Sequence, residues 1–90
     1  MTFSGKQYLV IGATGVFGSL IARALIERGA TVIGTARGND SAANLPTDLA
    51  QKLLLDLESQ TSIEQLTDYL LASDTQLDGI INASGRVGFG

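Results

Sequence analysis

Apolar residues recur along this chain with two different periods, and the change from one to the other divides it into strands and helices. Four short runs are rich in apolar and β-branched residues, which predicts β-strands: Gln7–Ile11, Thr31–Ala36, Lys52–Leu57 and Asp78–Asn82. The third run is apolar at successive positions, as in strands of a parallel sheet that are buried on both faces. We therefore expect a sheet with the third strand well covered.

Two of the connections have the period of an amphipathic helix. The first spans Val16–Arg28, and its apolar residues form one face that is predicted to pack on the sheet: Phe17, Leu20, Ile21, Ala24 and Leu25. The second helix is predicted to begin at Thr61, because Thr61 and Glu64 have the spacing of a capping box. Its apolar face follows the same spacing: Ile63, Leu66 and Leu70.

The segment Arg37–Lys52 is the least regular part of the chain. It collects glycine, asparagine, aspartate and serine with the only proline, which predicts a loop with at most a turn or two of helix.

Strands that alternate with helix-length connections imply right-handed crossovers and a parallel sheet covered on both faces. We predict a doubly wound, Rossmann-like α/β fold with strand order 3-2-1-4, which is the first half of such a fold, in a single unit spanning residues 1–90.

Composition narrows the function classes. With 44% hydrophobic and 17% charged residues the chain is typical of a globular protein, and its net charge of −3 argues against nucleic acid or an anionic membrane as partner. It has neither cysteine nor histidine, which argues against disulfides and against a metal site. The first residues lack the pattern of a signal peptide and no apolar run approaches a membrane span, so the expected location is the cytoplasm.

Three glycines follow the first predicted strand in the sequence VIGATGVFGSL. In this fold, the turn between that strand and the next helix presents free N–H groups and the positive end of the helix dipole, which together bind anions. Gly12 would let the strand turn, Gly15 would let a pyrophosphate approach the backbone, and Gly18 would let the helix pack closely on the sheet. The alternative is a tight turn that binds no ligand.

The end of the second strand indicates which dinucleotide would bind. NAD sites place an acidic residue there for the ribose 2′-hydroxyl, whereas NADP sites use a nearby arginine for the 2′-phosphate. This chain has Thr35 and Ala36, without a carboxylate, and then Arg37. NADP is therefore favoured over NAD, although Arg37 as a solvated surface residue is the simpler alternative.

Two more polar residues end strands at the same edge of the predicted sheet. Asp56 could accept a hydrogen bond from the adenine amino group, and it could equally be a turn residue before the second helix. Asn82 ends the fourth strand, where its side chain could instead bond to neighbouring backbone groups.

The segments GKQYLVIGATGVFG, TAR, LLLDL and LDGIINASG, in this order and spacing, resemble the N-terminal half of short-chain dehydrogenases/reductases. The resemblance implies that Gly12, Gly15 and Gly18, with Thr14, Val16 and Phe17 between them, cradle the cofactor pyrophosphate. It also implies that Arg37 holds the 2′-phosphate and that Asp56 and the Leu57 amide flank the adenine. A last group matches the Asn-Asn-Ala-Gly segment that lines the cofactor in this family: Asn82, Ala83, Ser84 and Gly85.

The chain also departs from the family. Its Gly-Ala-Thr-Gly-x-x-Gly motif is commoner in the extended and atypical branches, and Ala83 and Ser84 replace the usual Asn and Ala. The family's catalytic Tyr-x-x-x-Lys pair does not occur in these 90 residues, and Tyr69 is followed four residues later by Ser73. No catalytic residue is assigned, and the expectation is that the catalytic half is absent. The chain would then be a fragment of an oxidoreductase or a stand-alone nucleotide-binding remnant.

The leading hypothesis is therefore the NADP(H)-binding segment of a reductase that acts on a carbonyl or alcohol substrate. A second is a non-enzymatic NADP-binding sensor or interaction module. A third is an S-adenosylmethionine-dependent methyltransferase, which is weakened by the missing acid after the second strand. Because the fourth strand would have an open edge with apolar Ile80 and Ile81, we also expect a homo-oligomer formed through that edge.

Overall fold

One parallel sheet forms the centre of the molecule in the computed structural model, with strand order β3-β2-β1-β4. The structure describes residues 2–38, 45–46 and 48–83. Its elements are β1 (Gln7–Ile11), α1 (Val16–Glu27), β2 (Thr31–Ala36), β3 (Gln51–Leu54), α3 (Gln60–Ala72) and β4 (Gly79–Asn82). The predicted α/β class and strand order are confirmed.

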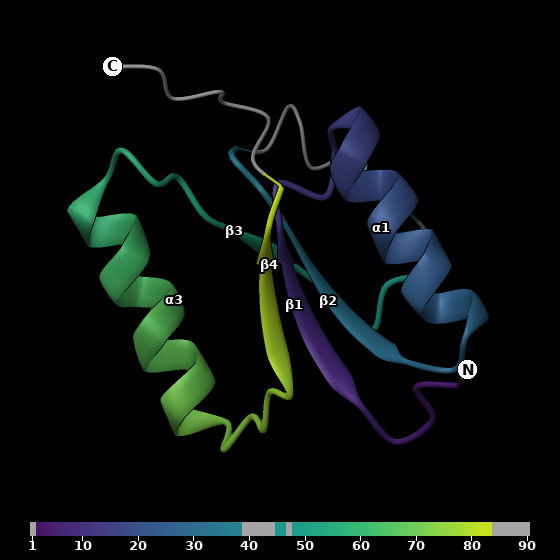
Figure 1. Cartoon of the computed structure of the whole chain (residues 1–90). Helices are drawn as coiled ribbons and strands as arrows, with labels where there is room; N and C mark the ends of the chain where they lie inside the picture. Colours follow the sequence, from purple (N-terminus) through teal and green to yellow (C-terminus); the bar gives the residue numbers. More distant parts are fainter. Residues whose placement is uncertain (1, 39–44, 47, 84–90) are drawn as a thin grey trace.

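The two helices lie on opposite faces of the sheet, α1 against β1 and β2 and α3 against β3 (Figure 1). This arrangement follows from the right-handed crossovers, because the chain moves outward from β1 to β3 and then returns to β4 on the other side of β1. Ile11 pairs with Asn82 and Ala36 pairs with Leu54, so the carboxyl ends of the strands share one edge. In the part of the chain that the structure describes, no helix is both long and apolar enough to span a membrane.

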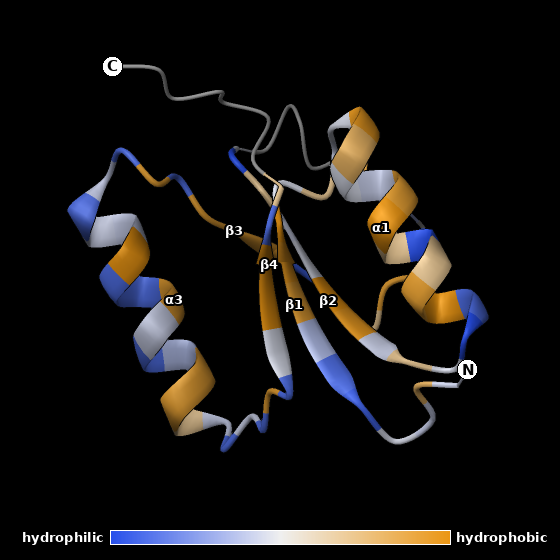
Figure 2. Cartoon of the chain, in the orientation of Figure 1, coloured by the Kyte–Doolittle hydropathy of each residue, from blue (hydrophilic) through white to orange (hydrophobic). Residues whose placement is uncertain are grey.

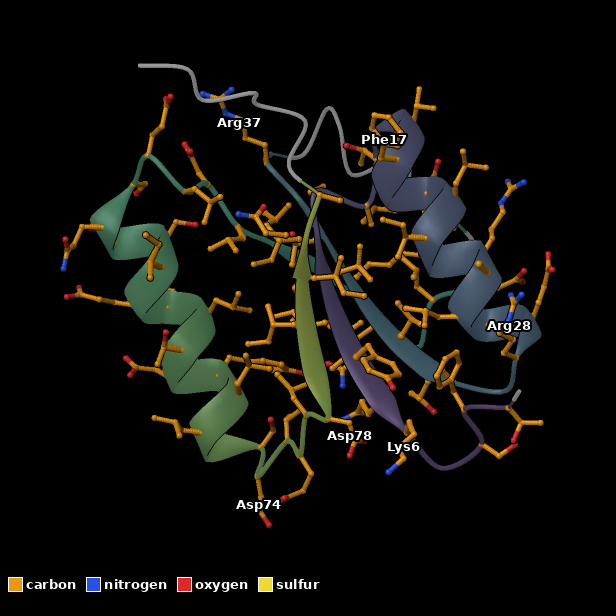
Figure 3. The ribbon with its side chains drawn as sticks, viewed as in Figure 1. Lys6, Phe17, Arg28, Arg37, Asp74 and Asp78 are labelled. Carbon is orange, nitrogen blue, oxygen red and sulfur yellow. The ribbon has the colours of Figure 1, made fainter. Side chains whose placement is uncertain are left out.

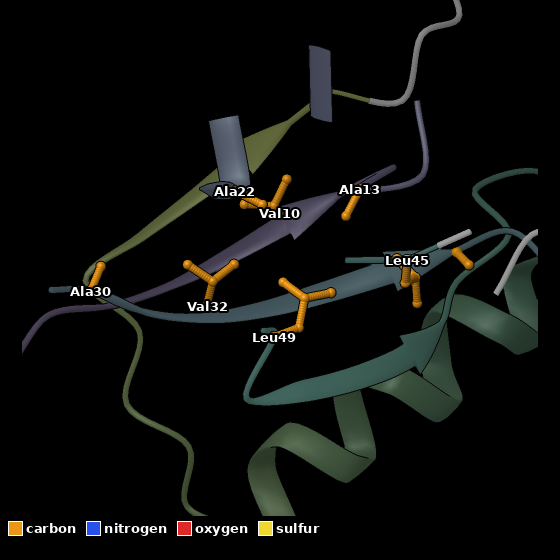
Figure 4. Packing of buried hydrophobic residues seen from close by; sticks show 8 residues of the cluster. Val10, Ala13, Ala22, Ala30, Val32, Leu45 and Leu49 are labelled. Carbon is orange, nitrogen blue, oxygen red and sulfur yellow. The ribbon is translucent and has the colours of Figure 1, made fainter. Parts of the chain in front are cut away.

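The main core lies between α1 and the sheet, and half of its buried members are alanines (Figure 4). Its members are Val10, Ala13, Ala22, Ala30, Val32, Ala36, Leu45 and Leu49. The two leucines come from the connection between β2 and β3, which covers the sheet beside α1 although its described residues form no helix. Residues 39–44 and 47 of that predicted loop lie outside the described residues.

The predicted sheet face of α1 is wrong for its two residues of the first turns, Phe17 and Leu20, whereas Leu25 packs in part against the core. Phe17 is 73% exposed and Leu20 is 59% exposed, whereas the buried residues of the helix are Gly18 and Ala22. The smallest side chains face the sheet because they let the helix backbone approach the strands and the glycine turn closely. The larger residues on either side of Gly18 and Ala22 contact the core only in part, as Leu25 and Ile26 do.

Two expectations about β3 and α3 also need correction. β3 is shorter than predicted and half exposed, with Lys52 and Leu54 facing solvent, because it is the edge strand of the sheet.

The N-cap of α3 is Ser59 and not Thr61. The Ser59 Oγ accepts the Ser62 N–H at 3.1 Å, which satisfies a free donor of the first turn. Polar and apolar residues alternate around α3 (Figure 2).

Candidate functional site

The predicted site residues meet at the carboxyl edge of the sheet. Gly12 follows β1, Arg37 follows β2, Asp56 lies two residues after β3, and Asn82 ends β4. Arg37 and Phe17 lie at the same end of the molecule in Figure 3, opposite the Lys6–Asp78 ion pair. In doubly wound folds ligands bind at this edge, outside the carboxyl ends of the strands.

The glycine turn is anchored to β2 by Thr35. The Gly12 N–H donates to the Thr35 Oγ1 at 3.1 Å, and the Ala13 N–H donates to the Thr35 carbonyl at 3.0 Å. Thr35 is 1% exposed, so both bonds are shielded from water. Gly12 has φ of +80°, a conformation that side chains with a Cβ rarely adopt. A glycine is therefore strongly favoured at this position, where the chain leaves β1 sharply.

Gly15 and Gly18 have different surroundings. A Cβ at Gly18 would lie 2.1 Å from the Gly12 carbonyl oxygen, so only glycine permits this contact between helix and turn. A Cβ at Gly15 would meet nothing closer than that same oxygen at 3.8 Å, and Gly15 has an ordinary φ of −75°. The fold does not require a glycine there. The missing side chain instead leaves the backbone open to an approaching group.

The first turn of α1 can bind an anion. Its N-cap, Gly15, offers no side-chain acceptor, and the first turn contains no acidic residue. The N–H groups of Val16, Phe17 and Gly18 consequently have no acceptor within the helix, and the helix dipole adds positive potential. The side chains of Val16 and Phe17 are 75% and 73% exposed, so the first turn of α1 lies at the surface of the described structure. Thr14 is half-buried beside them in the turn.

Arg37 lies between two carboxylates. Its Nη2 donates to the Glu58 Oε2 at 2.9 Å, and its Nε lies 3.7 Å from the Asp56 Oδ1. Asp56 is fixed in turn, because its N–H donates to the Ser62 Oγ at 2.9 Å and its Oδ1 accepts the Glu58 N–H at 3.0 Å. Asp56 is thus a turn residue and also part of a charged cluster with Arg37 and Glu58. The guanidinium remains largely exposed and can exchange partners.

The remaining predicted residues lie nearby in the fold. Leu57 is 44% exposed beside Asp56. Asn82 pairs with Ile11, and the Ala83 N–H donates to the Ile11 carbonyl at 2.8 Å, so β4 follows β1 to the edge where the glycine turn begins. Ser84 and Gly85 lie outside the described residues. Within residues 2–38, 45–46 and 48–83, no three acidic side chains are grouped to hold a metal ion.

Sequence reasoning missed two residues of this edge, Thr35 and Glu58. Thr35 is the only polar side chain buried in the described part of the chain, and the available signal was a hydroxyl between Gly34 and Ala36, near the end of an apolar strand. Glu58 is the second acid of an Asp-x-Glu sequence that follows a strand. Its ion pair with Arg37 joins segments 21 residues apart, and the local pattern contains no sign of that.

Comparison with known proteins gives one family. The family model described as short chain dehydrogenase matches residues 6–90. The 3-oxoacyl-[acyl-carrier-protein] reductase FabG of Salmonella typhimurium is 36% identical over 88 residues, which are 94% of this chain and 36% of that protein. The NADP-dependent 3-hydroxy acid dehydrogenase YdfG of Salmonella typhi is 35% identical over 80 residues, covering 86% of this chain and 32% of that protein.

Solved structures have the same fold. A short-chain type dehydrogenase/reductase from Mycobacterium ulcerans aligns with a TM-score of 0.73 at 22% identity, over 92% of this chain and 34% of that one. The Pseudomonas aeruginosa RhlG/NADP active-site complex aligns with a TM-score of 0.73 at 30% identity, over 90% of this chain and 35% of that one. The chain spans about a third of the length of the relatives it matches.

Proposed function

Because the chain belongs to the short-chain dehydrogenase family, we propose that it is the NADP(H)-binding segment of an oxidoreductase that acts on a carbonyl or alcohol substrate. The observation that carries this proposal is Gly15. It is a glycine that the fold does not need, placed where a phosphate would meet the free N–H groups of α1. The methyltransferase alternative is set aside because the family match covers residues 6–90.

The choice of NADP over NAD rests on Arg37. No acidic residue ends β2, where Ala36 stands, and Arg37 follows it with an exposed guanidinium. A guanidinium forms charge-assisted, often forked, hydrogen bonds with phosphate oxygens. The name of the relative YdfG describes it as NADP-dependent, and RhlG was solved in a complex with NADP, which supports the same choice here.

The residues of this chain would bind and orient the cofactor. The N–H groups of α1 and of the glycine turn would hold the pyrophosphate, Arg37 the 2′-phosphate, and Asp56 with the Leu57 amide the adenine. The segment from Asn82 to Gly85 would line the cofactor where β4 ends. When bound, the cofactor supplies or accepts the hydride. The 90 residues contain no Tyr-x-x-x-Lys segment, so we assign none of them a role in proton transfer.

Calorimetric titration of the chain with NADPH and NADH tests this proposal. We expect NADPH to bind more tightly by about tenfold or more, because the contact between phosphate and Arg37 contributes roughly 1.5–3 kcal/mol in a partly solvated site. The Arg37→Ala variant should lose this preference and keep its affinity for NADH. Equal affinities for the two nucleotides, or an Arg37→Ala variant that still prefers NADPH, would contradict the NADP assignment.

A second candidate function is a non-enzymatic NADP-binding sensor or interaction module. The family match also allows it, because the nucleotide site described above would serve a sensor as well as an enzyme. Both candidates need the same nucleotide site, so the titration does not separate them. A natural protein in which this chain continues into such a segment would favour the enzyme.

We also propose that the chain forms a homo-oligomer through the outer edge of β4, the edge away from β1. Among the described residues β4 pairs only with β1, and Ile80 on it is 62% exposed. Such an edge has N–H and C=O groups that can pair with another strand. Ile81 does not share this exposure, because it packs in part against the core beneath α1.

A further inference from the structure

A carboxylate already binds the guanidinium that we assign to the 2′-phosphate. The Arg37 Nη2 donates to the Glu58 Oε2 at 2.9 Å. We propose that Glu58 is a cofactor-discriminating residue: it binds the Arg37 guanidinium, and a 2′-phosphate competes with it there. This inference rests on the proposed function, since it concerns the same nucleotide site. It adds a residue that opposes the preference set by Arg37.

The geometry places Glu58 and a phosphate in competition for the same donors. A phosphate binds a guanidinium best through two adjacent N–H groups in a fork. In Arg37 the Nη2 is bound to Glu58, and the Nε faces Asp56 at 3.7 Å. The Arg37 and Glu58 side chains are 59% and 52% exposed, so neither is sterically prevented from moving apart. A phosphate that takes the fork of Nε and Nη2 must therefore displace the Glu58 carboxylate.

The backbone fixes Glu58 beside Arg37. The Glu58 N–H donates to the Asp56 Oδ1 at 3.0 Å, and the Ser59 N–H donates to the Asp56 carbonyl at 3.0 Å, which together form a turn. Ser59 then caps α3 through the Ser62 N–H. Glu58 is consequently held between the end of β3 and the start of α3, at a fixed distance from the end of β2.

The charges in this cluster give the direction of the effect. Arg37 contributes one positive charge, and Asp56 with Glu58 contributes two negative charges, so the cluster is negative overall. A phosphate is repelled by Glu58, whereas a free ribose 2′-hydroxyl could donate a hydrogen bond to it. Glu58 should therefore weaken the binding of NADP(H) and not that of NAD(H).

The test compares two nucleotides that differ only in the 2′-phosphate, 2′-phospho-ADP-ribose and ADP-ribose. Calorimetry would measure both with the unchanged chain and with Glu58→Gln, Glu58→Ala, Arg37→Ala and the Arg37→Ala/Glu58→Gln double variant. Glu64→Gln serves as the matched control, because it removes one acidic charge from the exposed first turns of α3. Circular dichroism confirms that each variant is folded.

We expect Glu58→Gln to tighten the binding of 2′-phospho-ADP-ribose about threefold to tenfold, the range for a unit charge near a solvated site. Binding of ADP-ribose should stay equal or weaken, and Glu64→Gln should change neither. The effect should vanish in the Arg37→Ala background, because the competition needs the guanidinium. Glu58→Ala should act in the same direction as Glu58→Gln.

Three results would overturn the inference, and they separate its failure from the failure of the proposed function. If Arg37→Ala weakens the binding of 2′-phospho-ADP-ribose but Glu58→Gln does not tighten it, the inference is wrong and the proposed function stands. If Arg37→Ala binds both nucleotides as the unchanged chain does, the proposed 2′-phosphate site is wrong and the inference is wrong with it. Absence of binding by the unchanged chain would have the same consequence.

Discussion

At the residue scale, Gly15 and Gly18 belong to one motif but lack a side chain for different reasons. Gly18 touches the Gly12 carbonyl so closely that a Cβ would lie 2.1 Å from the oxygen, whereas the space next to Gly15 is open. Gly18 therefore serves the packing of α1, whereas the role that we propose for Gly15 is in binding the ligand. Substituting each in turn separates nucleotide affinity from stability.

We expect Gly18→Ala to destabilise the chain by about 3 kcal/mol, because the new methyl group must displace backbone atoms. Chemical denaturation measures this free energy of unfolding.

Gly15→Ala should lower the free energy of unfolding by at most about 1 kcal/mol, the usual difference between N-cap residues. It should also weaken NADPH binding about tenfold, since its methyl group would stand between the backbone and the pyrophosphate. A Gly15→Ala variant with unchanged nucleotide affinity would contradict the assigned role.

At the scale of the element, α1 faces the sheet with its smallest residues. Gly18 and Ala22 are buried, while Phe17 and Leu20 are mostly exposed. Hydropathy alone favours the bulky residues as the buried face. Close packing against the glycine turn favours the small ones, and in this helix it decides the orientation.

Substitutions on α1 can distinguish these two faces. Ala22→Leu should destabilise the chain by about 1–3 kcal/mol, because a position that is 0% exposed has no room for three more carbons. Leu20→Gln should change the free energy of unfolding by no more than about 0.5 kcal/mol, as is usual at exposed positions. Thermal denaturation of both variants gives the comparison. If Leu20→Gln destabilised the chain more than Ala22→Leu, α1 would have to be rotated so that Leu20 faces the sheet.

The elements that were predictable from the sequence are those defined by a local period. All four strands and both helices follow from it, and their order leads to the parallel sheet and to its ligand-binding edge. The N-cap of α3 was not predictable, since Ser59 and Thr61 both have suitable side chains. The buried face of α1 and the ion pair between Arg37 and Glu58 depend on segments distant in sequence, which no local pattern records.

In the sheet of the whole molecule, β4 is an outer strand that pairs with β1 alone among the described strands, and its Ile80 is exposed. We expect the chain to be a dimer at micromolar concentration, because a two-fold pairing covers both edges at once. Light scattering measures the mass. Ile80→Lys should shift the equilibrium toward the monomer, since charged residues on an edge oppose pairing. A stable, folded monomer of the unchanged chain would contradict the proposal.

Catalysis depends on more than the nucleotide site, because reduction of a carbonyl by hydride transfer needs a proton donor as well as a bound cofactor. These 90 residues contain no Tyr-x-x-x-Lys segment. The purified chain is therefore expected to oxidise NADPH no faster than buffer in the presence of small ketones and aldehydes, as followed by absorbance. Oxidation that depends on substrate, in a preparation free of longer reductases, would show that another residue donates the proton.

The anchoring of the glycine turn by Thr35 links the nucleotide site to the folding equilibrium. The Gly12 N–H reaches a hydroxyl 23 residues further along the chain, so the turn acquires its shape only after β1 and β2 have paired. The unfolded chain has no such site, and nucleotide binds the native state alone. NADPH at a hundred times its dissociation constant should therefore add about 2.7 kcal/mol to the free energy of unfolding. The melting temperature should then rise with each further addition of NADPH.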